Sequence, residues 1–195
     1  MFNKLKKICP IIIDIETSGL NTERNTILEI ALINVNYNKN GHITPNKILH
    51  LHVIPFNYSQ INNKSLLCNK IDIFKKIRFA ISEKEASIYI LEFMKNTINE
   101  SKTKKCVLVG HNCWFDLIFL NNLMYRTKKT TNYYHQFTTI DTATLGNIFY
   151  KQSTLSKLAK HIGINFNNKK NHSAIYDAKI TTLIFCHIIN KINEK

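Results

Sequence analysis

Acidic residues are scarce in this chain of 195 residues, which has 13 Asp and Glu against 27 Lys and Arg and a formal net charge of +14 at pH 7. This excess of positive charge favours a polyanionic partner, such as nucleic acid or a phosphate-rich surface. The frequent Asn, Lys, Ile and Tyr residues allow a second explanation, the compositional drift of an AT-rich genome. The charge alone therefore leaves both explanations open.

Paired cysteines and long apolar runs are also missing. The five cysteines are odd in number, widely spaced and without a Cys-x-x-Cys or His-linked zinc pattern, so we expect free thiols in a reducing cytosol. No run approaches the roughly 20 apolar residues that span a bilayer, and the basic N-terminal residues lack the apolar region of a signal peptide. The sequence predicts a cytoplasmic protein with no membrane partner. Its length suits a single domain over residues 1–195.

Residues 11–19 form the most informative stretch, an apolar run that carries two carboxylates and ends at a glycine. The β-branched residues predict a buried strand, in which an unpaired charge is costly. Asp14 and Glu16 are two residues apart, so on a strand both side chains lie on one face. Converging carboxylates suit a hard divalent cation, whereas two solvated acids at a strand end are the plainer alternative. The rest of the chain must decide between them.

Further strands are predicted at residues 27–35 and 48–54, and a short helix at 61–68. Ser82 and Glu85 have the spacing of a capping box at the start of a longer helix. On this helix we expect Ile88, Leu91 and Met94 to form the buried stripe.

The second half of the chain supplies two more acids. A short strand at residues 106–109 ends at Gly110, and the helix that follows to about residue 125 has Asp116 in an early turn, at the strand end where open α/β sheets bind ligands. A last strand is predicted at 137–140, with Asp141 as the N-cap of the next helix, and a further helix at 154–161. The final helix includes Asp177, and we expect His172 on the loop before it, because five residues along one helix would place the two side chains about 140° apart.

Together, three segments resemble the motifs of the DEDD exonucleases of the ribonuclease H-like fold, in the subgroup with a histidine five residues before the last aspartate. The segments are 14–17, 111–116 and 172–177. The resemblance extends over nearly the whole chain to the ribonuclease T family, through residues 28–31, 50–56, 71–72, 141–143, 155–157, 185–186 and 189–190. It implies an α/β fold with a ribonuclease H-like mixed five-stranded β-sheet flanked by helices.

The resemblance also implies a mechanism. Two Mg²⁺ ions, which Mn²⁺ can replace, would be held by Asp14, Glu16, Asp116 and Asp177, with Asp14 bridging both. Two metals about 4 Å apart can stabilise the attacking and leaving oxygens of a phosphodiester. His172 would be the general base, because a neutral imidazole can accept a proton from water.

The family's activity is the trimming of RNA 3′ ends, in tRNA and other stable RNAs, by a homodimer that releases nucleoside monophosphates. Basic residues of one subunit feed RNA to the site of the other, and Lys4, Lys6 and Lys105 are our candidates for this patch, with the pair Lys128 and Lys129 next.

Substrate binding in the family uses four phenylalanines and a glutamate that contact the terminal bases. Phe115 and Phe137 match two of these positions, and stacking on aromatic rings suits unpaired bases. The other three positions are Leu20, Lys64 and Cys68 here. Because Lys64 reverses a charge and Cys68 fills less space, we expect the family's discrimination against terminal cytosine to be weakened.

Two alternatives remain at this level. The first is a DNA- or oligonucleotide-directed 3′-to-5′ exonuclease of the same superfamily, possible because the metals act on the phosphodiester whatever the sugar, so that single-stranded DNA could also be a substrate. The second is a non-catalytic nucleic-acid-binding module, which would have no need of four acids and a histidine.

Overall fold

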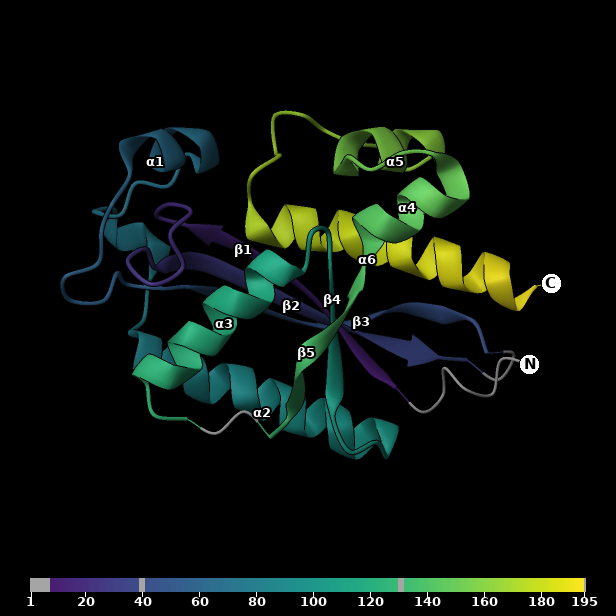
Figure 1. The fold of residues 1–195 in the computed structure, drawn as a ribbon, viewed down its shortest axis with the longest axis horizontal. Coiled ribbons are helices and arrows are strands. Elements are labelled where there is room, and N and C mark those ends of the chain that lie inside the picture. Colours follow the sequence, from purple (N-terminus) through teal and green to yellow (C-terminus); the bar gives the residue numbers. More distant parts are fainter. Residues whose placement is uncertain (1–7, 39–40, 130–131, 195) are drawn as a thin grey trace.

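One β-sheet organises the molecule, and helices cover both of its faces (Figure 1). The computed structural model describes residues 8–38, 41–129 and 132–194. In these residues the strands are β1 Cys9–Thr17, β2 Ile27–Tyr37, β3 Ile43–His52, β4 Cys106–Gly110 and β5 Tyr134–Asp141. The helices are α1 Asn63–Asn69, the 3-10 turn η2 Lys76–Arg78, α2 Glu83–Ser101, α3 Trp114–Arg126, α4 Thr142–Tyr150, α5 Leu155–His161 and α6 Ala174–Asn193. The predicted mixed five-stranded sheet flanked by helices is confirmed.

The sheet has the order β3-β2-β1-β4-β5, with β1 at its centre. β1 is antiparallel to β2 and parallel to β4, β2 is antiparallel to β3, and β4 is parallel to β5. The carboxyl ends of β1, β4 and β5 therefore meet at one edge of the sheet. Open α/β sheets bind their ligands at such an edge.

Alternate residues of β1 face different helices. Ile11 and Ile13 are fully buried in the cluster that includes α2 and α3, whereas Ile12 is fully buried against α6. Because the strand period is two, Asp14 and Glu16 follow Ile12 onto the α6 side. The sequence thus places two carboxylates next to the helix that carries Asp177.

Most predicted boundaries agree with the structure, and three expectations need correction. β3 begins at Ile43 rather than at residue 48 and ends at His52, and β5 extends on both sides of the predicted residues 137–140. The capping box of α2 is confirmed, and of the predicted buried stripe Met94 is fully buried and Leu91 packs against the core, whereas Ile88 is 46% exposed; Ala86 and Ile90 complete the buried face. Among the described residues, no helix combines the length and apolarity needed to cross a membrane.

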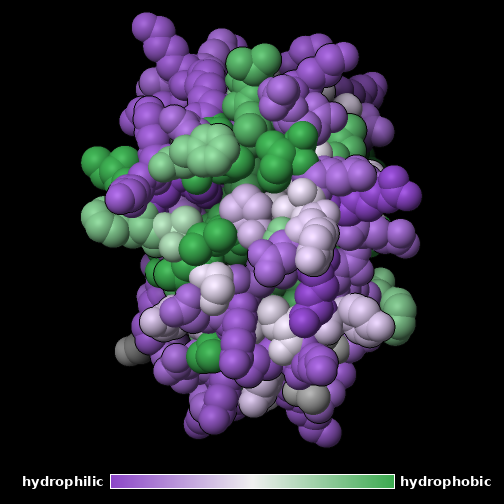
Figure 2. Space-filling view, turned by 90° about the vertical axis from the view of Figure 1, so that its left-hand side faces the viewer, coloured by the Kyte–Doolittle hydropathy of each residue, from purple (hydrophilic) through white to green (hydrophobic). Residues whose placement is uncertain are grey.

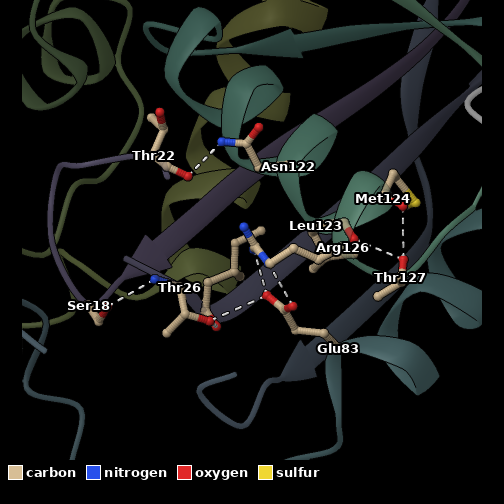
Figure 3. A network of polar contacts seen from close by, with 10 residues as sticks. Ser18, Thr22, Thr26, Glu83, Asn122, Leu123, Met124, Arg126 and Thr127 are labelled. Atoms are coloured by element: carbon tan, nitrogen blue, oxygen red, sulfur yellow. Dashed lines mark hydrogen bonds and ion pairs between the residues drawn. The ribbon is translucent and has the colours of Figure 1, made fainter. Parts of the chain in front are cut away.

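A polar network fixes the turn after β1 against α3 and the start of α2 (Figure 3). Arg126 of α3 donates to both carboxylate oxygens of the buried Glu83, from Nε at 3.0 Å and from a terminal nitrogen at 2.7 Å. The Thr26 hydroxyl donates to the same carboxylate at 3.5 Å, and Asn122 Nδ2 donates to the Thr22 carbonyl at 2.6 Å. The turn and α3 are therefore held together.

Candidate active site

Four acids from three elements line one cleft of about 660 Å³. Asp14 and Glu16 come from the carboxyl end of β1, Asp116 from the first turn of α3 and Asp177 from the first turn of α6. Asp116 is 5% exposed and Asp177 6% exposed, whereas Asp14 and Glu16 are half-buried. The structure therefore brings together all four acids that the sequence motifs singled out.

A tight turn between β4 and α3 places Asp116 in the cleft. Gly110 ends β4 where a side chain cannot fit, because a Cβ there would lie 2.9 Å from Cys113 Cβ. Asn112 has a φ of +67°, a conformation that Asn tolerates better than most residues. The Cys113 amide then donates to Asp141 Oδ2 at 2.9 Å, which ties the start of α3 to the end of β5.

The acid cluster is electrostatically strained. Burial raises the pKa of Asp14 well above its usual range, and the charges of Asp116, Asp177 and Glu16 raise it further. Burial likewise raises the pKa of Asp116, and it raises the pKa of Glu16 to about 8 with help from the charge of Asp177. All three pKa values rise for the same two reasons, because burial and neighbouring carboxylates both disfavour the charged form.

One carboxylate oxygen shows what the site can hold. Asp177 Oδ2 accepts a hydrogen bond from the His172 amide at 3.0 Å, but Asp177 Oδ1 is buried with no hydrogen-bond partner in the described structure. Ligand atoms of Glu16, Asp177 and His172 lie within 4.8 Å of one another. An unpartnered buried oxygen among carboxylates of raised pKa fits hard divalent cations, which prefer oxygen ligands.

His172 lies on the loop before α6, as the five-residue spacing to Asp177 predicts, and it also lines the cleft. Its φ is +66°, an uncommon conformation for a residue with a side chain. Its side chain is exposed, and Nε2 lies 3.0 Å from Asn171 Nδ2. The ring can therefore meet a substrate from solvent, while its backbone is fixed to Asp177.

A fifth acid, Glu29, contacts the residues at the start of α6 that follow the His172 loop. Glu29 of β2 is 4% exposed, and Glu29 Oε1 lies 2.6 Å from His50 Nε2 and accepts from the Ser173 hydroxyl at 3.3 Å and from the Ile175 amide at 3.5 Å. Burial alone would raise the pKa of Glu29, but the hydrogen bond and charge of His50 lower it. Glu29 thus holds the first turn of α6. An acid within an apolar strand, at residues 28–31, is the sequence signal that could have identified it.

Only some of the expected substrate-binding residues reach the cleft. Leu20 and Phe115 line it. Lys64 and Cys68 are exposed on α1, which packs beside the end of β1, and Phe137 is 94% exposed on β5; none of these three lines the cleft.

The lysines of the expected basic patch lie in different parts of the chain. Lys105 is exposed and precedes β4, at the opposite end of that strand from the acids. Lys4 and Lys6 lie outside the described residues. Lys128 and Lys129 lie just after α3, which ends at Arg126, with Lys128 in the turn that follows the helix.

The sequence patterns did not single out Trp114, the largest apolar side chain in the cleft. It is the first residue of α3, two positions before Asp116, and it is 60% exposed. The sequence signal that could have identified it is its place in the segment 111–116, which also contains Asp116.

Comparisons with known proteins identify a family for this chain. A family model described as exonuclease, and labelled RNase T, matches residues 11–185. Ribonuclease T of Buchnera aphidicola subsp. Cinara cedri is 39% identical over 189 residues, which are 97% of this chain and 86% of the relative. Ribonuclease T of Histophilus somni is 36% identical over 98% of this chain and 88% of the relative.

Solved structures share the fold at lower identity. The nuclease domain of 3′hExo, a DEDDh family member bound to rAMP, has a TM-score of 0.74 at 19% identity over 94% of this chain and 92% of that one. Escherichia coli exonuclease I in complex with a dT13 oligonucleotide has a TM-score of 0.74 at 15% identity, over 93% of this chain and 41% of that one. These structures share the fold alone. The family model and the relatives, which match over nearly their full length, show that the chain belongs to the ribonuclease T family, 3′-to-5′ exoribonucleases of the DEDD superfamily.

Proposed function

We propose that this chain trims the 3′ ends of tRNA and other stable RNAs by Mg²⁺-dependent hydrolysis, releasing nucleoside monophosphates one at a time. The observation that carries the proposal is the convergence of four carboxylates in one cleft, with an unpartnered Asp177 oxygen and too little positive charge to balance them. A binding module gains nothing from such a costly cluster, whereas a cation-dependent nuclease needs it.

The acids divide into two overlapping ligand sets. Asp14, Glu16 and Asp177 would hold one cation, and Asp14 with Asp116 the other, with Mn²⁺ as a substitute for Mg²⁺. Two bound cations would supply the stabilisation of the attacking and leaving oxygens of the phosphodiester. The residues of the chain fix the geometry, because each acid is carried by a strand end or by the first turn of a helix.

His172 is the proposed general base. Its imidazole takes a proton from the attacking water, a role that requires a neutral ring within reach of the substrate. The hydrogen bond from the His172 amide to Asp177 Oδ2 keeps the loop beside the acid cluster, and Glu29 supports the same turn through Ser173 and Ile175.

The cleft binds the terminal nucleotide through Leu20 and Phe115, which lie beside the acids. Phe137, Lys64 and Cys68 then contact the nucleotides that extend beyond the cleft. Lys105, with Lys4 and Lys6, forms the basic patch that guides RNA to the active site of the second subunit in a homodimer. We place the whole of residues 1–195 in one exonuclease domain that acts in the cytoplasm.

The test is a hydrolysis assay on an RNA hairpin with a single-stranded 3′ overhang. With Mg²⁺ we expect successive loss of overhang nucleotides and release of nucleoside monophosphates. EDTA should stop the reaction, and Asp14→Asn should reduce the rate at least a hundredfold, since catalysis by metals contributes several kcal/mol. Glu92→Gln, which changes an exposed acid of α2, is the control and should keep the wild-type rate.

Two results would contradict the proposal. RNA that is bound but not shortened in Mg²⁺ or Mn²⁺ would identify a binding module. A DNA hairpin of the same sequence, shortened while the RNA is not, would identify the DNA-directed activity. Overhangs ending in each of the four bases measure the discrimination against terminal cytosine, which we expect to be weak.

A further inference from the structure

Trp114 is the only tryptophan of the chain, and it stands in the cleft without contributing to the core. Helix α3 packs through Phe119, Leu120 and Leu123, all fully buried, while the Trp114 side chain is 60% exposed. A large aromatic residue left open to water in a cleft marks a binding surface, because its burial against a partner is favourable.

The orientation of the indole is supported by contacts with two further aromatic rings. Its ring is 5.8 Å from that of Phe115, with an interplanar angle of 87°. The Phe115 ring is in turn 4.8 Å from that of the fully buried Phe119. The edge-to-face arrangement anchors Trp114 to the core through Phe115 and keeps its orientation before any ligand binds.

The support of the helix adds to this rigidity. α3 is joined to the turn that carries Leu20 by the hydrogen bond from Asn122 to Thr22, and to α2 by the bidentate contact of Arg126 with Glu83 (Figure 3). Since both Leu20 and Trp114 line the cleft, its apolar surfaces are fixed relative to each other. A fixed surface loses little conformational entropy when a planar ligand binds to it.

We propose that Trp114 is a substrate-binding residue that stacks on an unpaired base at the 3′ end of the nucleic acid and sets the affinity for single-stranded ends. The proposal rests on the proposed nuclease function. A base is the group that fits, because its flat face matches the indole and the phosphodiester of the same nucleotide can lie beside Asp116, two residues further along α3. Stacking also tolerates any base, since every base presents a π-face.

Few other aromatic residues of this chain are placed to stack on a base. Two of the positions at which the ribonuclease T family is expected to contact bases with aromatic rings are Leu20 and Cys68 here, and Cys68 does not line the cleft. Leu20 offers apolar contact without a π-face. Trp114 and Phe115 are thus the aromatic residues that line the described cleft, and Phe115 is the less exposed of the two.

The test measures binding separately from hydrolysis, in protein carrying Asp14→Asn throughout. Because Trp114 is the only tryptophan, its fluorescence reports on this position alone. Titration with a hairpin RNA that has a short 3′ overhang should quench the emission saturably. Trp114→Ala should weaken binding about 5- to 150-fold, the range for loss of one stacked base. Trp114→Phe should keep most of the affinity, and Trp114→Leu should behave like Ala.

A matched control is Tyr125→Ala, which removes an 85% exposed aromatic side chain from the other end of α3 and should leave the affinity unchanged. The decisive comparison uses RNA whose terminal nucleotide lacks its base. If Trp114 stacks on that base, the RNA without the base should have the same affinity for the protein with Trp114 as for the Trp114→Ala variant.

The proposal is overturned if Trp114→Ala has no effect, or if it weakens binding equally with and without the terminal base. It is also overturned if the variant changes the oligomeric state and affinity returns when a higher protein concentration restores the assembly, because the indole then belongs to an interface between copies. Any of these results leaves the nuclease function standing if Asp14-dependent hydrolysis is present. Absence of hydrolysis in the wild-type protein would refute that function instead.

Discussion

In protein without divalent cations, we expect Glu16→Gln to raise the stability at neutral pH although it removes a proposed metal ligand. Burial and the charge of Asp177 raise the pKa of Glu16 from 4.5 to about 8. The folded protein thus binds a proton at this group more tightly than the unfolded chain does. Stability from this group is complete below about pH 4.5 and is lost as the pH rises through 8. Gln has nearly the shape of protonated Glu and keeps the stability at every pH.

The magnitude follows from the shift. A pH of 7 is about 2.5 units above the pKa of Glu16 in the unfolded chain. Since each unit corresponds to 1.36 kcal/mol, ionisation of this group favours unfolding by at most about 3 kcal/mol. Glu16 is half-buried, and water screens part of this cost, so we expect about 1.5 kcal/mol. For a chain of this length, that corresponds to about 3 to 6 °C in the melting temperature.

The assay is thermal unfolding in EDTA at pH 5, 6, 7 and 8. The melting temperature of Glu16→Gln should exceed that of the wild type at pH 7 and 8, and the difference should nearly vanish at pH 5. Glu92→Gln controls for the loss of one acid from a chain of net charge +14 and should show no such pH-dependent gain. Adding Mg²⁺ should stabilise the wild type more than the variant, because a ligand that binds the folded state raises its stability.

A difference of the same size at pH 5 and pH 8 would refute the reasoning, since it could not come from ionisation of Glu16. A lower melting temperature for Glu16→Gln in EDTA at pH 8 would refute it more directly. That result would mean that the acid cluster is balanced by charges within the protein, so that no cation is required.

Three further predictions concern stability and substrate binding. Arg126→Met leaves the Glu83 carboxylate buried without its ion-pair partner and should cost about 3 kcal/mol in urea unfolding, part of which the added change Glu83→Leu should restore. Gly146→Ala should destabilise by about 1 to 3 kcal/mol despite the better helix propensity of Ala, because the new Cβ would lie 2.4 Å from Leu158 Cδ2; an equal or higher melting temperature would contradict this packing argument. The affinity for longer RNA should fall steeply as salt rises from 50 to 200 mM, and a flat salt dependence would show that the lysines do not contact phosphates.

The central strands could be predicted from the sequence because their signals are local. The apolar run of β1 and the turn at Gly110 mark elements that are buried on both faces. The edge strands were harder. Pro45 interrupts the pattern of β3, yet it pairs opposite Val35 because an edge strand tolerates a missing amide donor. β5 begins at the fully buried Tyr134, but the four residues that follow it are exposed and give no strand pattern.

Helix α2 shows why a correct helix can receive a partly wrong buried face. Ile88, Leu91 and Met94 recur at helical spacing, but so do Ala86, Ile90 and Met94. Periodicity alone does not choose between overlapping stripes. The choice depends on the sheet beneath, whose cluster takes the small Ala86 and leaves Ile88 46% exposed on the surface. Tertiary packing therefore decides what the pattern leaves open.

Local geometry was enough to predict which elements carry three of the acids, whereas their assignment to one site came from the resemblance to the DEDD exonucleases. The cleft's surface for the base was not predictable. Asp14 and Glu16 need only the strand period, and Asp116 needs only the helix start after β4. Trp114 has the same local signal as a core residue. Its exposure follows from the direction in which α3 leaves the sheet, which no pattern of neighbouring residues encodes. Figure 2 shows the α1 side of the molecule, where apolar side chains likewise interrupt a mostly hydrophilic surface.

The two halves of the site are joined through the turn after β1. The turn after β1 contains Gly19. A Cβ at this position would lie 2.4 Å from Asn25 Oδ1, which fills the inside of the turn. The same Asn25 side chain accepts from the Asn21 amide and donates to the Gln60 carbonyl. A side chain at Gly19 would therefore move Leu20 and disturb the strand end that carries Glu16. The cation ligands and the surface for the base depend on one turn, so their positions cannot change independently.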